Sequence, residues 1–124
     1  MAENVSRIII KLIINEIGEA EGELVRHMAP RTVDAITKKL PIEGRAALWG
    51  EEVYFEIPLR MGEEKAKAHV EKGTIGFWPM GNALCIFYGE TQPYSPVNVV
   101  GQITGNLELF RQVKSGAKIK VERA

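Results

Sequence analysis

The chain has 124 residues, the length of one domain, and its 16 acidic side chains balance its 16 basic ones. This balance excludes the strongly positive surface that nucleic-acid binding normally needs. Cys85 is the single cysteine, which excludes an internal disulfide. We therefore expect one domain spanning residues 1–124, with no nucleic-acid partner.

The N-terminal residues do not resemble a targeting segment. The chain begins Met1-Ala2-Glu3, with an acidic residue where a secretory signal carries basic residues. The apolar run over residues 8–14 is interrupted by Lys11 and is far shorter than the ~20 residues of a membrane helix. We expect a cytoplasmic protein with no membrane partner.

The first elements of the chain read as a hairpin. β-Branched residues are dense over residues 7–14, and both alternating faces are apolar, which predicts a central strand covered on both sides. Residues 18–22 are rich in glycine and glutamate, which predicts a turn. Residues 23–28 are then the second strand of the hairpin.

A short helix follows the hairpin. Thr32 is placed to cap its first turn. Val33, Ile36 and Leu40 recur at helical spacing and form one apolar face. Pro41 ends the helix, because proline cannot continue the backbone hydrogen bonds.

The middle of the chain is only partly readable. Residues 44–58 predict two pieces of strand around a turn at Trp49 and Gly50. Residues 59–72 leave two interpretations open: a short helix over residues 63–71, whose charges recur at helical spacing, or a ragged edge strand.

The last third of the sequence predicts short strands separated by turn-forming residues. A turn over residues 79–82 (PMGN) joins the first two of these strands. Asn106 is placed to cap a short helix before the final strand. The predicted strands are residues 74–78, 83–88, 97–104 and 117–121.

This order of about eight strands and two short helices, without alternating strand–helix units, predicts a mainly β fold. A closed antiparallel barrel with helices capping its ends accounts for it, since closure removes exposed strand edges. From the pattern alone, a β-sandwich is the alternative.

Three blocks of the sequence resemble cyclophilins in the same order. Residues 29–40 (APRTVDAITKKL) and 49–58 (WGEEVYFEIP) resemble the cyclophilin helix and the strand that carries Phe-His-Arg. Residues 73–88 (GTIGFWPMGNALCIFY) resemble a pair of cyclophilin strands, and residues 99–107 a later strand and helix start. The whole is most similar to compact prokaryotic cyclophilin-like proteins of unknown function. This resemblance implies a closed antiparallel cyclophilin-like barrel of about eight strands with two short capping helices.

The resemblance also implies a site, a groove on the barrel wall. Cyclophilins hold a proline ring there, and an arginine donates to the prolyl nitrogen. In this chain Phe55 or Glu56, depending on register, stands in that arginine's place, and neither can donate in that way. We therefore expect prolyl isomerase activity to be weak or absent. The remaining catalytic candidates are Glu56 and a relocated donor, Arg60 or Arg45.

Aromatic and methionine side chains are the predicted ligand contacts. Phe77, Met80 and Phe87 match positions in the walls of the cyclophilin proline pocket, although Phe77 and Phe87 also fit a barrel core. Trp78 and Tyr88 alternate with these residues, so we expect them to face outward, where aromatic residues favour binding. With Phe55, they complete the predicted ligand-binding set.

We expect a binding domain that holds an extended peptide, such as a proline-containing one, or a small apolar ligand. A peptidyl-prolyl isomerase with a non-standard donor is the first alternative. A hydrolytic enzyme that uses Glu56 is the second. The sequence does not decide whether the protein self-associates.

Other chemistry has little support in the sequence. Cys85 lies in a predicted strand and is expected to be a buried thiol. His27 and His69 have no carboxylates or thiols at metal-binding spacing, so we expect no metal and no cofactor. Glu51 and Glu52 are expected to be an ordinary solvated pair.

Overall fold

The structure is a computed structural model and describes residues 6–124. Glu3, on which the expectation about targeting rests, lies outside this range. Within it, nine strands form one antiparallel sheet in the order β3-β9-β1-β2-β8-β6-β7-β5-β4. The strands are β1 (Arg7–Ile14), β2 (Gly18–Val25), β3 (Ile42–Arg45), β4 (Ala47–Trp49), β5 (Glu52–Glu56), β6 (Thr74–Trp78), β7 (Ala83–Phe87), β8 (Asn98–Gly105) and β9 (Lys118–Arg123). The helices are η1 (Arg26–Met28), α1 (Pro30–Lys39) and η2 (Leu107–Gln112).

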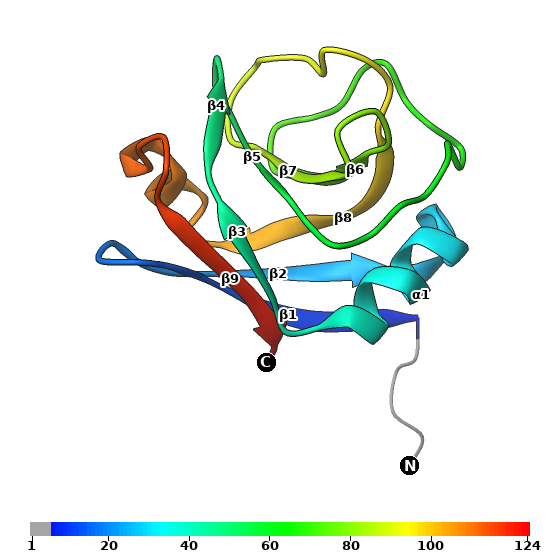
Figure 1. The fold of residues 1–124 in the computed structure, drawn as a ribbon, viewed down its shortest axis with the longest axis horizontal. Coiled ribbons are helices and arrows are strands. Elements are labelled where there is room, and N and C mark those ends of the chain that lie inside the picture. The colour runs from blue at the N-terminus through cyan, green and yellow to red at the C-terminus, as the bar shows by residue number, and fades with distance from the viewer. Residues whose placement is uncertain (1–5) are drawn as a thin grey trace.

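The sheet curls into a nearly closed barrel (Figure 1). Its two outermost strands, β3 and β4, are consecutive in the chain and are separated only by Ala46. β3 pairs with β9 and β4 pairs with β5, so this one stretch of backbone joins the two ends of the sheet. The prediction of a mainly β, closed antiparallel barrel is confirmed.

The barrel interior is filled by apolar side chains. Alternate residues of β1, including Ile10 and Leu12, point inward and are fully buried. The intervening Ile9 is 53% exposed. The prediction that β1 is covered on both sides is therefore wrong, because the outer face of this strand meets solvent and its β-branched residues there reflect strand propensity.

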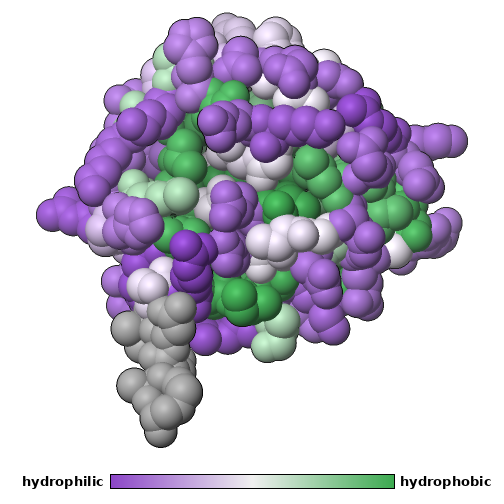
Figure 2. Space-filling model, turned by 180° about the vertical axis from the view of Figure 1, so that it is seen from behind, coloured by the Kyte–Doolittle hydropathy of each residue, from purple (hydrophilic) through white to green (hydrophobic). Residues whose placement is uncertain are grey.

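Some large apolar side chains remain on the surface. On the face turned away in Figure 1, apolar areas lie between polar side chains (Figure 2). The exposed large hydrophobic residues are Ile9, Leu48, Trp49, Met80 and Tyr94.

The first hairpin turns earlier than the sequence predicts. Its turn occupies residues 15–17, with Glu16 in the left-handed region at φ 66°. Residues 18–22, predicted as a turn, form the start of β2 instead. Gly22 has a different reason to be glycine: a Cβ there would lie 3.0 Å from the Gln102 carbonyl oxygen of the neighbouring β8. The predicted second strand ends at Val25 and continues as η1.

The predicted helix is α1, which packs against β2 and β8 and buries Val33 and Ile36. Thr32 lies inside the first turn, so it is not the cap that the sequence predicted, and Ala29 occupies the cap position without a side-chain bond. None of the helices in residues 6–124 has the length and apolar character needed to cross a membrane.

Glu64 supplies the missing cap from a distant part of the chain. Its carboxylate accepts hydrogen bonds from Arg31 N at 3.0 Å, Thr32 N at 2.9 Å and Thr32 Oγ1 at 2.7 Å. Burial alone would raise the pKa of Glu64, but these bonds from Arg31 and Thr32 outweigh it and hold the pKa below its usual value. Asn98 completes the junction by accepting from Glu64 N at 2.8 Å.

The 57–73 segment, between β5 and β6, contains neither the predicted helix nor a regular edge strand. Apart from a single bridge, its backbone is irregular and runs over the outside of the barrel (Figure 1). That bridge pairs Lys67 with Val97 through reciprocal bonds of 2.8 and 3.0 Å.

The second predicted helix is the 3₁₀ helix η2. Asn106 stands at its N-terminal boundary at φ 62°, but its side chain donates to Glu19 O at 3.0 Å and does not cap the helix. The predicted cap is therefore wrong, while the predicted helix is present.

Candidate functional site

Strand β5 presents two different faces. Val53 and Phe55 point into the barrel and belong to its core. Glu52 and Tyr54 alternate with them and lie on the outer wall. The partners on β7 follow the same alternation, since Val53 faces Ile86 and Glu52 faces Phe87.

A second, smaller apolar cluster covers the outer wall of β5, β6 and β7. We call it the outer-wall cluster. Its fully buried members are Cys85, Phe87 and Val97, and its half-buried members are Tyr54, Val70 and Trp78.

Two irregular segments cover this cluster, the 57–73 segment and the 88–97 segment. Val70 comes from the first and Val97 from the second. Gln92 ties the two together, because its Oε1 accepts from Val70 N at 2.9 Å and its Nε2 donates to Val70 O at 3.2 Å. The cover is thus held by bonds that resemble those between strands.

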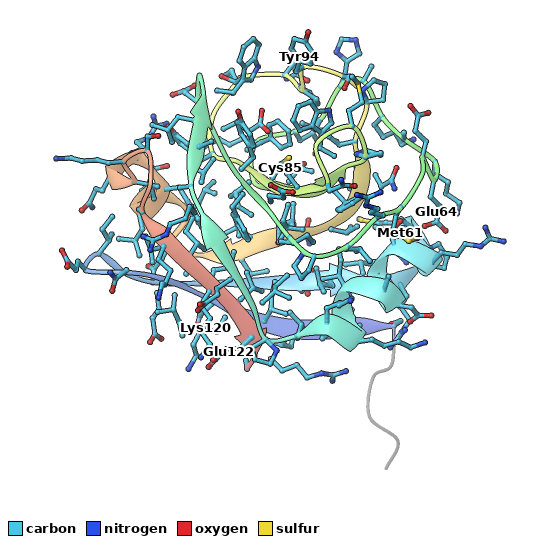
Figure 3. All side chains as sticks on the ribbon, viewed as in Figure 1. Met61, Glu64, Cys85, Tyr94, Lys120 and Glu122 are labelled. Carbon is cyan, nitrogen blue, oxygen red and sulfur yellow. The ribbon has the colours of Figure 1, made fainter. Side chains whose placement is uncertain are left out.

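A pocket of about 220 Å³ opens between the outer wall and the 88–97 segment. Tyr94, which lines the pocket, lies on the 88–97 segment, and Cys85 lies in strand β7 below it (Figure 3). Tyr94 is 68% exposed, so the pocket is open to solvent on this side. The lining residues are Trp49, Glu52, Tyr54, Trp78, Pro93, Tyr94 and Val97.

The four aromatic side chains of the pocket contact one another edge to face. Trp49 and Tyr94 have ring centroids 5.6 Å apart, Tyr94 and Trp78 6.1 Å, and Trp78 and Tyr54 5.9 Å. Their interplanar angles are 89°, 78° and 81° in the same order. Such contacts stabilise aromatic pairs beyond simple burial. These contacts between neighbouring rings therefore fix the orientation of the four aromatic side chains around the pocket.

Both indole nitrogens are engaged within the protein. Trp49 Nε1 donates to Gln92 O at 3.3 Å, and Trp78 Nε1 donates to Ser95 Oγ at 2.6 Å. These bonds anchor the tryptophans to the 88–97 segment. A bound molecule would meet their ring surfaces.

Glu52 is the one charged residue that lines the pocket. It is only 5% exposed, and no basic side chain in residues 6–124 pairs with it. Burial raises the pKa of Glu52 to about 7, and the Cys85 thiol acts in the opposite direction by hydrogen bonding to the carboxylate. Near neutral pH the pocket therefore holds a carboxyl group that can either keep or release its proton.

Cys85 lies beneath the pocket and is fully buried, as the sequence predicted. Burial raises the pKa of its thiol, and the nearby Glu52 charge and hydrogen bond raise it further. The thiol therefore stays protonated and is a poor nucleophile.

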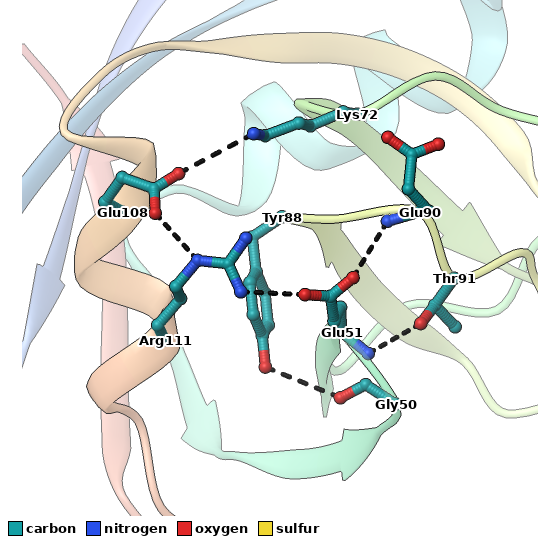
Figure 4. Close-up of polar contacts among 8 residues, drawn as sticks. All are labelled: Gly50, Glu51, Lys72, Tyr88, Glu90, Thr91, Glu108 and Arg111. Atoms are coloured by element: carbon teal, nitrogen blue, oxygen red, sulfur yellow. Dashed lines mark hydrogen bonds and ion pairs between the residues drawn. The ribbon is translucent and has the colours of Figure 1, made fainter.

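The turn between Trp49 and Glu52 is fastened by an ion-pair cluster (Figure 4). Arg111 on η2 donates to Glu51 Oε2 and to Glu108 Oε1, both at 2.7 Å, and its guanidinium lies 5.4 Å from the centre of the Tyr88 ring. The bond from Arg111 lowers the pKa of both carboxyl groups. Thr91 Oγ1 accepts from Glu51 N at 2.7 Å, which joins the turn to the 88–97 segment.

The predicted ligand residues separate into different environments. Phe55 and Phe77 are fully buried inside the barrel and present no surface to the pocket. Phe87 is fully buried on the outer wall, opposite Glu52. Tyr88 is 8% exposed and lies in the core beneath Arg111, not outward as expected.

Of the predicted ligand residues, Trp78 alone lines the pocket. Met80 is 72% exposed, and its Sδ accepts from Ser95 Oγ at 3.2 Å, beside the Trp78 indole. The part of all six predicted residues in ligand binding remains a prediction.

The catalytic candidates lie elsewhere. Glu56 and Arg60 are exposed and share a surface hollow with Asn82 and Pro58. Arg45 lies in an adjoining hollow with Glu56 and donates to Gly116 O at 3.2 Å. Catalysis by any of them remains a prediction.

The carboxyl group of the pocket was not predicted from the sequence. The expectation that Glu52 is solvated is wrong, because the 88–97 segment covers it. Its spacing from Tyr54 was the available signal, since residues two apart on a strand share a face. No group of three or more metal-ligating side chains occurs in residues 6–124, and His27 and His69 are both exposed.

Comparison with known proteins identifies the fold family. A family model described as cyclophilin-like matches residues 8–122. The chain belongs to the cyclophilin-like family. This confirms the resemblance seen in the sequence. The solution structure of the hypothetical protein AF2241 from Archaeoglobus fulgidus is similar over 100% of both chains, with 37% identity and a TM-score of 0.84.

A more distant structure shares the cyclophilin-like fold. McbB, solved in complex with tryptophan, is 18% identical and has a TM-score of 0.78. The similarity covers 92% of this chain and 44% of McbB. No curated protein matches the sequence.

Proposed function

We propose that this cyclophilin-like protein binds a small organic molecule in the aromatic pocket on its outer wall. The observation that carries the proposal is the combination of four aromatic side chains with one buried carboxyl group. Small-molecule sites typically have mostly apolar walls and a few polar groups that orient the ligand.

The size of the pocket favours a compact ligand. Its volume of about 220 Å³ is below the roughly 300–1,000 Å³ that is usual for drug-sized ligands. The pocket fits a small molecule or one side chain better than an extended peptide. Of the two ligand classes expected from the sequence, the geometry therefore supports the small ligand.

The geometry gives less support to a prolyl isomerase. An isomerase of the cyclophilin type needs a donor beside the prolyl nitrogen, but the charged group of this pocket is the Glu52 carboxyl. Arg60 and Arg45 lie at other hollows. We expect no acceleration of Xaa-Pro exchange in an NMR experiment with the protein. Acceleration that is lost in Arg60→Ala would support the isomerase instead.

Binding can be tested by an NMR screen of neutral and charged small molecules, including indole, choline and tryptophan, the molecule bound to McbB. We expect shift changes centred on Trp49, Trp78 and Tyr94. Tyr94→Ala should weaken binding without unfolding the protein, because this side chain is largely exposed. Ile9→Ala, on the exposed face of β1, is the control. If no compound shifts the pocket residues at millimolar concentration, the proposal is wrong.

A further inference from the structure

Among the described residues, no basic side chain lines the pocket. Its lining consists of aromatic residues, proline, valine and the carboxyl group of Glu52. The faces of aromatic rings carry partial negative charge, so they attract cations. Trp49, Trp78 and Tyr94 line the pocket together with Glu52, and the two tryptophans have committed their N–H groups to the protein.

Glu52 itself lacks a partner of opposite charge. Its carboxyl group hydrogen bonds to the Cys85 thiol, which is neutral. A buried carboxylate without a compensating charge is costly, so the empty pocket favours the protonated form. A ligand that carries a positive charge would supply the compensation, while an anionic ligand would be repelled.

A metal ion does not fit this lining. Metal sites bind through several oxygen, nitrogen or sulfur ligands, and the lining has one carboxyl group among apolar and aromatic side chains. Aromatic walls with a nearby carboxylate suit an organic cation, since substituted ammonium groups bind against ring faces.

We infer that the ligand is an organic cation whose substituted ammonium group rests against the rings of Trp49, Trp78 and Tyr94 and pairs with Glu52. This inference rests on the proposed binding function and adds the chemical class of the ligand. The small volume limits the ligand to a compact amine or quaternary ammonium compound.

Binding should be linked to release of a proton. Burial raises the pKa of Glu52 to about 7, and a bound cation favours its ionised form. Below pH 7 the cation must displace a proton, so its affinity should fall by up to about tenfold per pH unit. The titratable groups that face Glu52 are Cys85 from β7, Tyr54 from β5 itself and Tyr94 from the 88–97 segment.

The experiment compares cations with neutral molecules of the same shape. Choline is paired with 3,3-dimethylbutan-1-ol, in which carbon replaces the charged nitrogen, and tryptamine is paired with indole-3-ethanol. Affinities are measured by calorimetry or tryptophan fluorescence at pH 8. At least one cation should bind about tenfold or more tightly than its neutral partner. Choline keeps its charge at every pH, so its pH profile reports on the protein alone.

The second part of the experiment repeats these measurements with the variant Glu52→Gln. We expect this variant to lower cation affinity toward that of the neutral partner, because only the aromatic rings then favour the charge, and to remove the pH dependence, with little effect on the neutral compounds. Glu43→Gln, which changes an exposed carboxylate on β3, should behave as the wild type.

Each other outcome overturns a defined part of the account. If the cation and its neutral partner bind equally in both pairs, the inference that the ligand is a cation is wrong. The same holds if cation affinity is unchanged in Glu52→Gln. Neither result contradicts the proposal that the pocket binds a small molecule. Binding of indole-3-ethanol, with no binding of choline or tryptamine, also contradicts the inference that the ligand is a cation. If no compound perturbs the pocket, the proposed function itself fails.

Discussion

The two faces of strands β5 and β7 differ in what covers them. Inward-facing residues such as Val53 and Ile86 join one large apolar core without a carboxyl group. Outward-facing residues of the same strands include Glu52 and Cys85, which lie under irregular segments and beside a pocket. The same backbone thus supports a sealed interior and a polar, partly open exterior.

Barrel closure explains this division. The interior of a small barrel is just wide enough to be filled by its own side chains. In this protein the interior is filled by buried apolar side chains, so the pocket lies outside the wall, where a segment between strands covers it. The 88–97 segment does so here, and it contributes Pro93, Tyr94 and Val97 to the pocket.

The largest expected effect on stability comes from the inward-facing residues of the barrel. Phe77→Ala removes a fully buried ring from the barrel core. We expect the free energy of unfolding to fall by about 3–5 kcal/mol, because the change loses apolar burial and leaves a cavity. Tyr94→Ala, on the outer side, should cost far less. Chemical denaturation measures both, and equal losses would remove the distinction between the two faces.

A smaller effect of opposite sign is expected at the buried carboxyl group. Burial raises the pKa of Glu52 from its ordinary value of 4.5 to about 7, so the folded state holds the proton more tightly than the unfolded state. Its contribution to stability is therefore present below pH 4.5 and is lost as the pH rises to 7. Glu52→Gln should stabilise the protein at pH 8 by on the order of 2 kcal/mol, and much less at pH 4.5.

Thermal unfolding of the wild type, Glu52→Gln and Glu43→Gln at several pH values tests this sign. Glu43→Gln should show no such trend, because its side chain is exposed. A Glu52→Gln protein that is less stable than the wild type at pH 8 would indicate that the carboxylate is favourably paired.

The smallest expected effect is the loss of the helix cap that the 57–73 segment supplies to α1. Glu64→Ala removes the carboxylate that caps the helix, and we expect a loss of about 1 kcal/mol. Glu63→Ala, at the exposed neighbouring residue, should change stability much less. The bonds to Glu64 require its ionised form, so the difference between the variants should shrink as the pH falls below 4.5. Urea denaturation at pH 7 and pH 3.5 measures it.

Most strands could be predicted because their signals are local. Apolar residues and turn formers predicted β6 and β7, and the resemblance to cyclophilins supplied the barrel. The glycines of residues 18–22 misled the analysis, because Gly22 allows β8 to approach closely and does not form a turn. Closure through Ala46 depends on the pairing of β3 with the distant strand β9, which no local pattern contains.

The pocket could be predicted only in part, because its cover is irregular. Trp78 was recognised from its alternation along β6, and it does line the pocket. Glu52 and Tyr94 were not, since an outward-facing strand residue and a loop tyrosine both look solvated in sequence. The segment that brings them together is held by side-chain bonds such as those of Gln92, which have no sequence signature.

The ionisation of Glu52 tests the central claim most directly. Its side-chain carboxyl carbon can be followed by NMR from pH 4 to pH 9 in the ligand-free protein, with Glu52→Gln used to assign the signal. A midpoint near pH 7 is expected for a carboxyl group enclosed by aromatic side chains without a cation. A midpoint near 4.5 would show that this group is solvated or paired, and the pocket described here would not exist in solution.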